Sequence, residues 1–158
     1  MLSEKQIEIT RITVDAESEV YDRLSELDRL CVGADGWSAE SFRTECAKEN
    51  GIVLACFSGN DIAALLSGYT AVGEADITSV AVRPEYRRKG IAYRLMEEFE
   101  GMLPKDTESI FLEVRESNSA AIALYEKCGF EKLSIRKNFY SQPRENAAVM
   151  QKKLTKEG

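Results

Sequence analysis

The feature that most constrains the fold is a short basic turn, Arg87-Arg88-Lys89-Gly90-Ile91-Ala92, between two hydrophobic patterns. An apolar run ends at Val80-Ala81-Val82 before the turn, and a helical pattern begins at Ile91. A strand that leads straight into a helix leaves the first helical N–H groups without partners, at the positive end of the helix dipole. Gly90 and Ala92 add no bulk, so the turn is suited to bind a pyrophosphate. Basic, glycine-containing turns are common, however, and this motif alone does not establish a function.

The length and composition are those of one soluble globular domain, and we expect residues 1–158 to form it. Hydrophobic residues make up 44% of the chain and charged residues 30%. No stretch approaches the roughly 20 apolar residues that span a bilayer, and the first residues do not form the apolar core of an export signal. We therefore expect a cytoplasmic protein that has no membrane partner.

The chain contains no histidine, and its four cysteines are scattered without a C-x-x-C spacing. We therefore expect no bound metal and interpret the cysteines as reduced thiols. The lack of histidine also excludes Ser-His-Asp and Cys-His catalysis. Any proton transfer must then use Glu, Asp, Tyr, Lys, Cys or water.

The net charge of −6 argues against non-specific binding of nucleic acid. It mildly favours cationic partners such as basic peptides or amines. The plain alternative is that the acidity only keeps the protein soluble. Neither interpretation includes nucleic acid as a partner.

The apolar pattern predicts strands and helices that alternate along the chain. Strands are expected near residues 7–12, 52–57, 62–69, 75–82, 110–114, 130–140 and about 147–154. Helices are expected near residues 16–30, after Ser38, from Ile91 to about Gly101 and from Ser117-Asn118 to Cys128, with Gly129 in a left-handed conformation. A turn at residues 58–61 joins two strands as a hairpin, and residues 141–144 form the last loop. This order favours a sheet covered by helices on both faces.

Two segments resemble motifs of the GNAT superfamily of N-acetyltransferases. Residues 77–92 are similar to its acetyl-CoA motif, whose turn reads Q/R-x-x-G-x-G/A, and Arg87, Gly90 and Ala92 match that turn. Residues 112–130, which begin Leu-Glu-Val-Arg-Glu-Ser-Asn, are similar to the second cofactor segment. The resemblance implies an α+β, three-layer fold. Its sheet is mixed and mostly antiparallel, with about seven strands and helices on both faces.

Within the superfamily, the likeness is strongest to the RimI-type ribosomal-protein-alanine N-acetyltransferases. Residues 112–126 share their L-E-V-R-x-S-N-x-A-A-I-A-L-Y-E run, residues 36–42 resemble W-S-x-x-x-F, and residues 136–140 resemble R-x-N-Y-Y. Gly36 replaces the usual Pro, Phe139 replaces a Tyr, and residues 144–147 lack the His and Asp of G-H-E-D-A. These departures lie near the expected peptide groove. The resemblance implies acetyl transfer from acetyl-CoA to a protein N-terminus, such as that of a ribosomal protein.

The resemblance also implies which residues hold acetyl-CoA. Backbone groups of the strand are expected to pair with the pantetheine amides, and the basic turn to hold the pyrophosphate. Asn118 can cap its helix, and it can also reach the pantetheine arm. The resemblance favours both roles at once. The expected cofactor-binding residues are Ser79, Val80, Ala81, Val82, Arg87, Arg88, Lys89, Gly90, Ile91, Ala92, Asn118 and Tyr125.

The chemistry of acetyl transfer favours an N-terminal amine as acceptor. An α-amine with a pKa near 8 is about 10% neutral at pH 7, whereas a lysine near 10.4 is roughly 0.04% neutral. The resemblance implies that Glu113 is the general base, acting through a water or with its pKa raised by burial. It implies that Tyr125 is the general acid for the leaving thiolate.

Each of these residues also has a plain structural interpretation. Glu113 could be a strand-edge glutamate paired with Arg115 or with a helix residue, and Tyr125 could be a packing residue. Trp37 and Tyr140 are candidates for lining the acceptor groove, although aromatics in a domain of this size are more often core.

Two other functions stay open at this point. One is acetylation of a small free amine, such as an amino sugar, a polyamine or an antibiotic. The other is a non-catalytic module that binds acyl-CoA, although the presence of both Glu113 and Tyr125 argues against it.

Overall fold

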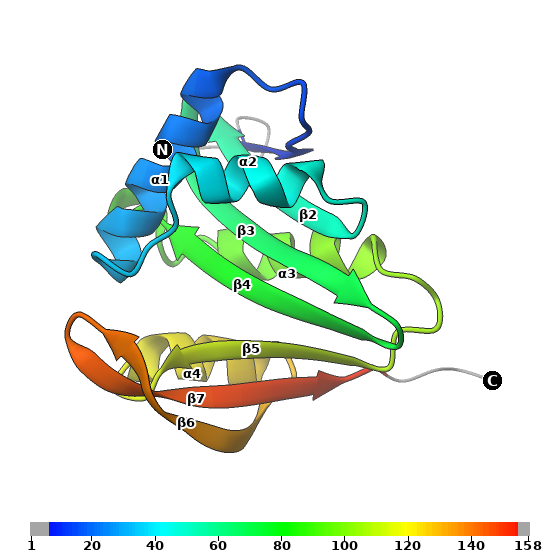
Figure 1. Ribbon diagram of the computed structural model, residues 1–158, viewed down its shortest axis with the longest axis vertical. Coiled ribbons are helices and arrows are strands. Elements are labelled where there is room, and N and C mark those ends of the chain that lie inside the picture. Colours follow the sequence, from blue (N-terminus) through cyan, green and yellow to red (C-terminus); the bar gives the residue numbers. More distant parts are fainter. Residues whose placement is uncertain (1–6, 155–158) are drawn as a thin grey trace.

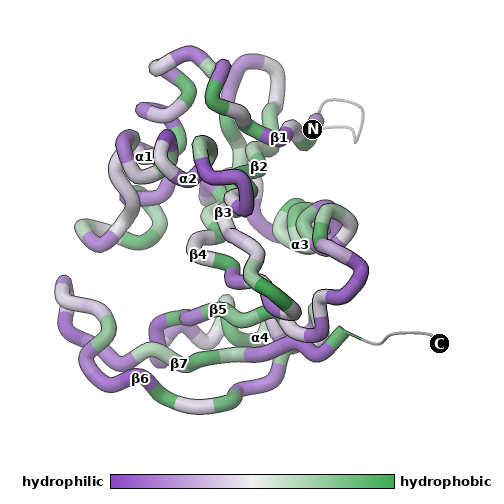
Figure 2. Tube along the Cα trace, turned by 45° about the vertical axis from the view of Figure 1, so that its right-hand side comes forward, coloured by the Kyte–Doolittle hydropathy of each residue, from purple (hydrophilic) through white to green (hydrophobic). Residues whose placement is uncertain are grey.

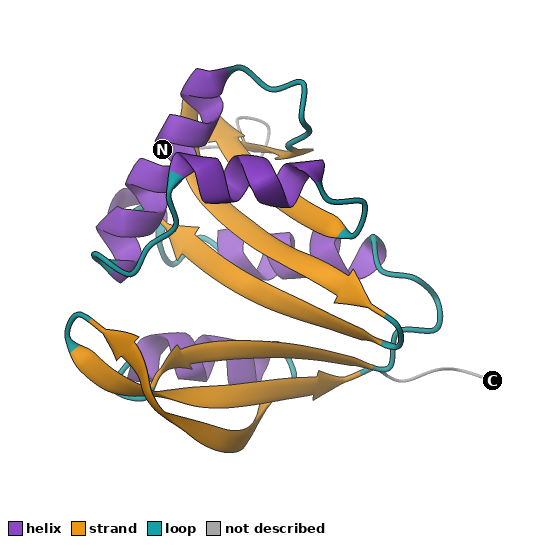
Figure 3. Ribbon diagram, viewed as in Figure 1, coloured by secondary structure: helices purple, strands orange, loops and turns teal. Residues whose placement is uncertain are grey.

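The structure is a computed structural model that describes residues 7–154. Within these residues seven strands form one sheet in the order β1-β2-β3-β4-β5-β7-β6, and four α-helices pack on it (Figures 1 and 3). The strands are β1 (Ile7–Arg11), β2 (Gly51–Ser58), β3 (Asp61–Ala71), β4 (Glu74–Val82), β5 (Ser109–Arg115), β6 (Glu131–Ser141) and β7 (Arg144–Lys153). The helices are α1 (Ser18–Val32), α2 (Ala39–Ala47), α3 (Ile91–Gly101) and α4 (Ser119–Lys127), with a 3₁₀ turn, η2, at Pro84–Tyr86.

The one parallel pair of the sheet is β4 with β5, and every other pair of neighbouring strands is antiparallel. The parallel pair is joined through α3, as a crossover between parallel strands requires. Its pairing covers only Glu74–Ile77 of β4 and Ser109–Leu112 of β5. Beyond that point the two strands diverge, as Figure 1 shows to the left of the molecule.

The helices cover both faces of the sheet, so the protein has two hydrophobic cores. In Figure 2, α1 and α2 lie on one side of β2, β3 and β4, and α3 lies on the other. The larger core combines the sheet with α3 and α4 and includes Leu54, Leu66, Ile77, Leu95, Phe99, Leu112, Val114, Tyr125 and Met150. The second core lies under α1 and α2 and includes Tyr21, Leu24, Leu27, Phe42, Val53, Leu65 and Ala81.

A β-bulge interrupts β4 at the point where it leaves β5. Ser79 pairs with Ser67 and Ile77 pairs with Gly68, so Thr78 is an extra residue on β4. The hydroxyl groups of Thr78 and Ser67 are hydrogen-bonded at 2.7 Å. A bulge bends its strand and re-aims the side chains that follow. Ile77 therefore packs in the core of α3, whereas Ser79 turns towards α1.

The helix termini follow the sequence signals. The side chain of Ser38 accepts a hydrogen bond from Ser41 N at 3.1 Å, which caps α2. Asn118 caps α4 in the same way, through Ala121 N at 3.1 Å. Gly129 follows α4 with φ +100°, the left-handed conformation predicted for it.

One boundary differs from the sequence prediction. Ser141 pairs with Arg144, so only Gln142 and Pro143 connect β6 to β7, and β7 begins at Arg144 rather than near residue 147. The polar run at residues 144–146 resembles a loop in the sequence. Glu145 and Asn146 nevertheless bind neighbouring backbone N–H groups, at Ser117 and Asn138, which accounts for a polar start to this strand.

Close packing between α3 and the sheet predicts a large cost for truncating Phe99, which is fully buried. A Cβ added at Gly68 would lie 2.8 Å from the Phe99 ring, which shows how closely the helix approaches β3. We expect Phe99→Ala to lower the free energy of unfolding by about 3–5 kcal/mol in urea denaturation. Tyr93→Ala on the exposed side of the same helix should change it by about 0.5 kcal/mol or less. Equal losses in the two variants would contradict this packing.

Candidate active site

The divergence of β4 and β5 brings two helix N-termini to the same end of the sheet. Because the strands are parallel, their carboxyl ends point the same way, and α3 and α4 begin after them. Ligands of sheets with parallel strands characteristically bind outside these carboxyl ends. The predicted cofactor residues fall on these four elements and on the turns between them.

The basic turn between β4 and α3 presents charge and a glycine to solvent. Arg87, Arg88 and Lys89 are all exposed. Arg87 also donates to the Val82 carbonyl at 3.0 Å, and its Nη2 lies 3.7 Å from Cys31 Sγ. Gly90 has φ +75°, and among residues 7–154 no side chain caps α3. The first N–H groups of α3 are thus available for an anion.

Residues 79–82 continue β4 after its pairing with β5 has ended. Their inner edge pairs with β3, from Ser67 opposite Ser79 to Ala64 opposite Val82. The other edge faces the space towards β5, where no ladder with that strand continues past Ile77. Backbone groups on such an edge can pair with the amides of an extended ligand.

Glu113 lies on the α1 and α2 side of β5, because side chains alternate along a strand and Leu112 and Val114 are in the core of α3 and α4. Its side chain is 25% exposed, and its carboxylate binds Arg136 Nη1 of β6 at 2.9 Å. The alternative partners considered from sequence, Arg115 or a helix residue, are therefore wrong. Arg136 is largely exposed, so its head can move aside from Glu113 when another cation arrives.

Tyr125 lies on the opposite side of the sheet, on α4, with 8% of its surface exposed. Its ring meets that of Phe130 edge-on at 6.1 Å between centroids. Burial, followed by the neighbouring Tyr140 and Cys128, raises the pKa of the Tyr125 phenol. The phenol therefore stays protonated near neutral pH and can act as a proton donor.

Tyr140, at the end of β6, is electrostatically coupled to both of these groups. Burial is the main cause that raises its pKa to about 12; Arg115 lowers this pKa and Glu113 raises it. Tyr140 also contributes to the raised pKa of Tyr125, so its phenol lies within electrostatic range of both candidate catalytic residues. Glu113 and Tyr125 thus lie on opposite faces of the sheet, near the end where β4 and β5 diverge.

Sequence reasoning missed Asp28, a carboxylate of α1 with only 1% of its surface exposed. Ser79 Oγ donates to Asp28 Oδ1, and Trp37 N donates to Asp28 Oδ2 at 2.7 Å. One buried group thus ties the bulged end of β4 to the connection between α1 and α2. The signal was present, since Asp28 falls at helical spacing from the buried Tyr21 and Leu24.

Trp37, a candidate for lining the acceptor groove, is half-buried. It packs on Phe42 at 5.3 Å between ring centroids, and its carbonyl accepts a hydrogen bond from Ser25 Oγ at 2.7 Å. Trp37 therefore marks the edge of the second core, next to the end of β4 that carries Ser79.

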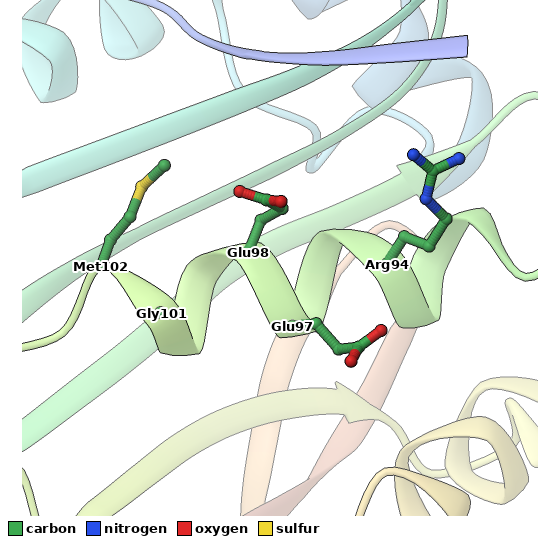
Figure 4. Close-up of a pocket in the computed structure, with 5 residues that line it drawn as sticks. All are labelled: Arg94, Glu97, Glu98, Gly101 and Met102. Atoms are coloured by element: carbon green, nitrogen blue, oxygen red, sulfur yellow. The ribbon is translucent and has the colours of Figure 1, made fainter. Parts of the chain in front are cut away.

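Other features of the surface do not coincide with this region. Figure 4 shows a pocket on the outer side of α3 that is lined by one helix only, through Arg94, Glu97, Glu98, Gly101 and Met102. None of these was predicted as a site residue. Between residues 7 and 154, no group of three or more Cys, Asp or Glu side chains is arranged to hold a metal ion, and no helix is long and apolar enough to cross a membrane. The cysteines are free thiols.

Comparison with known proteins identifies several acetyltransferases as relatives. Residues 9–130 match the Acetyltransferase (GNAT) family. A ribosomal protein bS18-alanine N-acetyltransferase from Haemophilus influenzae is 39% identical over 134 residues, which cover 82% of this chain and 90% of that protein. The crystal structure of the ribosomal-protein-S18-alanine N-acetyltransferase from Escherichia coli has a TM-score of 0.80 and 29% identity, and covers 96% of each chain.

A GNAT family acetyltransferase from Elizabethkingia anophelis, crystallised with acetyl-CoA bound, shares the fold alone at 17% identity. Its TM-score is 0.75, with 96% of this chain and 100% of that chain covered. These matches confirm the predicted fold class, a mixed and mostly antiparallel seven-stranded sheet between helices.

The burial of Asp28 predicts a specific pH dependence of stability. Burial raises the pKa of its carboxyl, while the hydrogen bonds from Ser79 and Trp37 lower it. A carboxyl with a raised folded pKa stabilises the fold most when protonated, and that stabilisation is lost as the pH rises through the folded pKa. We therefore expect the free energy of unfolding of Asp28→Asn, measured by urea denaturation relative to that of the unsubstituted protein, to be higher at pH 7 than at pH 4.5. A difference that is independent of pH, as expected for the exposed Asp22→Asn, would contradict it.

Proposed function

The chain belongs to the acetyltransferase (GNAT) family, and from this premise we propose that it transfers the acetyl group of acetyl-CoA to the N-terminal α-amine of a protein. Family membership makes the protein an acetyltransferase. The observation that carries the finer proposal is the divergence of β4 from β5, with Glu113 on one face of the sheet and Tyr125 on the other. The relatives from H. influenzae and E. coli are named for an alanine of ribosomal protein bS18 or S18, so a ribosomal protein is the acceptor we propose.

Acetyl-CoA is proposed to bind along the end of β4 and across the start of α3. The free edge of residues 79–82 would pair with the pantetheine amides. The N–H groups of the turn at Gly90, Ile91 and Ala92, with the cations of Arg87, Arg88 and Lys89, would hold the pyrophosphate. Asn118 and Tyr125, from α4, would contact the arm near the thioester.

The proposed reaction is a direct transfer without a covalent enzyme intermediate. The acceptor ammonium gives one proton to Glu113, directly or through a water, and becomes a nucleophilic amine. The C–N bond forms at the thioester carbon and the C–S bond breaks. Tyr125 gives its phenolic proton to the leaving thiolate, and the second amine proton restores the phenol through solvent. Glu113 releases the first amine proton to solvent, and the products are the acetylated amine, the thiol of CoA and one proton.

The environment of Glu113 supports an amine acceptor that arrives from the α1 and α2 side. The carboxylate is partly exposed and already binds one cation, Arg136. A protein N-terminus can replace that guanidinium, because an ion pair at this exposure is weak. The aromatic Tyr140 lies beside the same position and can contact the first residues of the acceptor.

Conservative substitutions test the two catalytic roles. We expect Glu113→Gln and Tyr125→Phe each to lower kcat by about 100-fold, because each removes one proton-transfer group, with the Kd for acetyl-CoA unchanged. Thiol release and mass spectrometry of a panel of peptides that begin with Ala are the measurements. Glu97→Gln and Tyr93→Phe, on the outer side of α3, are the matched controls.

Two outcomes would change the proposal in different ways. Normal turnover in either active-site variant would refute the role of that residue. Acetylation of small amines such as polyamines, beside unmodified peptides, would refute the protein acceptor and leave the transferase assignment intact.

The double role of Asn118 can be separated by two substitutions. Asp keeps an oxygen that caps α4 but loses the amide donor, whereas Ala loses both. We expect Asn118→Ala to lower the free energy of unfolding by about 1 kcal/mol and Asn118→Asp to leave it nearly unchanged. If the amide also binds the pantetheine arm, both variants should weaken acetyl-CoA binding by about tenfold in calorimetry. Unchanged affinity in Asn118→Asp would leave the cap as its role.

A further inference from the structure

The β6–β7 hairpin is tied to the connection between α1 and α2 through a single carboxylate, Asp35. Its Oδ1 accepts from Ser141 Oγ at 2.8 Å, and its Oδ2 accepts from Gln142 N at 3.1 Å and from Arg115 Nη2 at 3.0 Å. Figures 1 and 2 both show the tip of this hairpin beside the end of α1. The contact therefore links the hairpin to the segment between α1 and α2.

Arg115, on β5, binds both Asp35 and the β6–β7 hairpin. Besides Asp35, its guanidinium donates to the carbonyls of Pro143 at 2.9 Å and Gln142 at 3.1 Å and binds Glu145 Oε1 at 3.3 Å. It also lies over the ring of Tyr140, 4.3 Å from the centroid. The Arg115 side chain is 17% exposed, and both of its terminal nitrogens are hydrogen-bonded. Because these bonds reach the hairpin, they restrict its movement.

The connection that carries Asp35 is itself anchored to α1. Gly36 packs so tightly that a Cβ would lie 2.9 Å from backbone atoms of Arg29, and Trp37 N binds the buried Asp28. Gly36, which stands where the resembled family has a Pro, thus allows this close approach. Asp35 therefore lies on a segment that is anchored to α1, and from there it binds the hairpin.

We propose that Asp35 and Arg115 form a bridge that positions the β6–β7 hairpin and thereby sets a preference for a chain terminus over a small free amine. This inference rests on the proposed function. Arg115 is two residues beyond Glu113 on the same face of β5, and it lies over the ring of Tyr140, which belongs to β6 of the hairpin. In this proposal an acceptor with several residues extends from Glu113 along the hairpin, whereas a small amine needs only to reach Glu113. A hairpin that is already ordered costs the longer acceptor less on binding.

The test is the split between KM and kcat for two acceptors. Asp35→Asn removes the charge and one of the two acceptor oxygens of the bridge. We expect it to raise KM for an Ala-initiated peptide by about tenfold, with kcat, KM for acetyl-CoA and kcat/KM for ethylamine within about twofold. Hydrogen exchange at the Gln142 amide should become faster, because a neutral amide oxygen accepts from that N–H less strongly than the carboxylate does.

Two further variants make the result interpretable. Ser141→Ala removes one of the three hydrogen bonds to Asp35, and should raise peptide KM less than Asp35→Asn does. Asp22→Asn, an exposed carboxylate of α1, controls for the change in net charge and should leave all constants unchanged. Urea denaturation of each variant verifies that the fold is retained. If Asp35→Asn does not fold, Ser141→Ala carries the test.

The outcomes separate the two proposals. If the unsubstituted protein acetylates peptides and Asp35→Asn keeps peptide KM within about twofold, the bridge proposal is wrong and the proposed function stands. An equal loss for peptide and ethylamine would also overturn it, because a general distortion of the site would then be the cause. If the unsubstituted protein acetylates no peptide, the proposed function fails irrespective of the variants.

Discussion

The interaction on which the structure depends is the short parallel pairing of β4 with β5. It joins two halves of one sheet over Glu74–Ile77 and Ser109–Leu112 and then stops. The bulge at Thr78 bends β4 at that point, so the strand keeps its bonds to β3 while it leaves β5. Had the ladder continued, the backbone of residues 79–82 would be paired on both edges, and the two faces of the sheet would be separated by closed hydrogen bonds.

The rest of the site is arranged around this divergence. The larger core, which includes Tyr125, packs on the side of α3 and α4, and Asp28 ties β4 to the helices on the other side. The burial of a carboxylate is costly, and the protein retains Asp28 where two candidate substrate-binding segments meet. Asp35 and Arg115 make a second connection between the two halves. The candidate site thus depends on the β4–β5 backbone ladder and on the bridge between Asp35 and Arg115.

Most elements could be predicted because their signals are local. The apolar spacing of α3, the Asn118 cap and the glycine after α4 each depend on neighbours within a few residues, and all three lie where the pattern places them. The start of β7 could not be predicted in this way. Its polar residues resemble a loop, and only their pairing with β6 and the bonds of Glu145 and Asn146 make them a strand.

The sequence by itself determined the family, the strand-turn-helix order around Arg87 to Ala92 and the identity of the candidate catalytic residues, because ordered motifs carry this information in one dimension. Only the tertiary structure decided which side chains meet. Glu113 pairs with Arg136 rather than Arg115, Asp28 joins Ser79 to Trp37, and Asp35 reaches a hairpin 106 residues further along the chain. These contacts depend on where the strands diverge and how the helices pack, and such long-range geometry leaves no periodic signal in a single sequence.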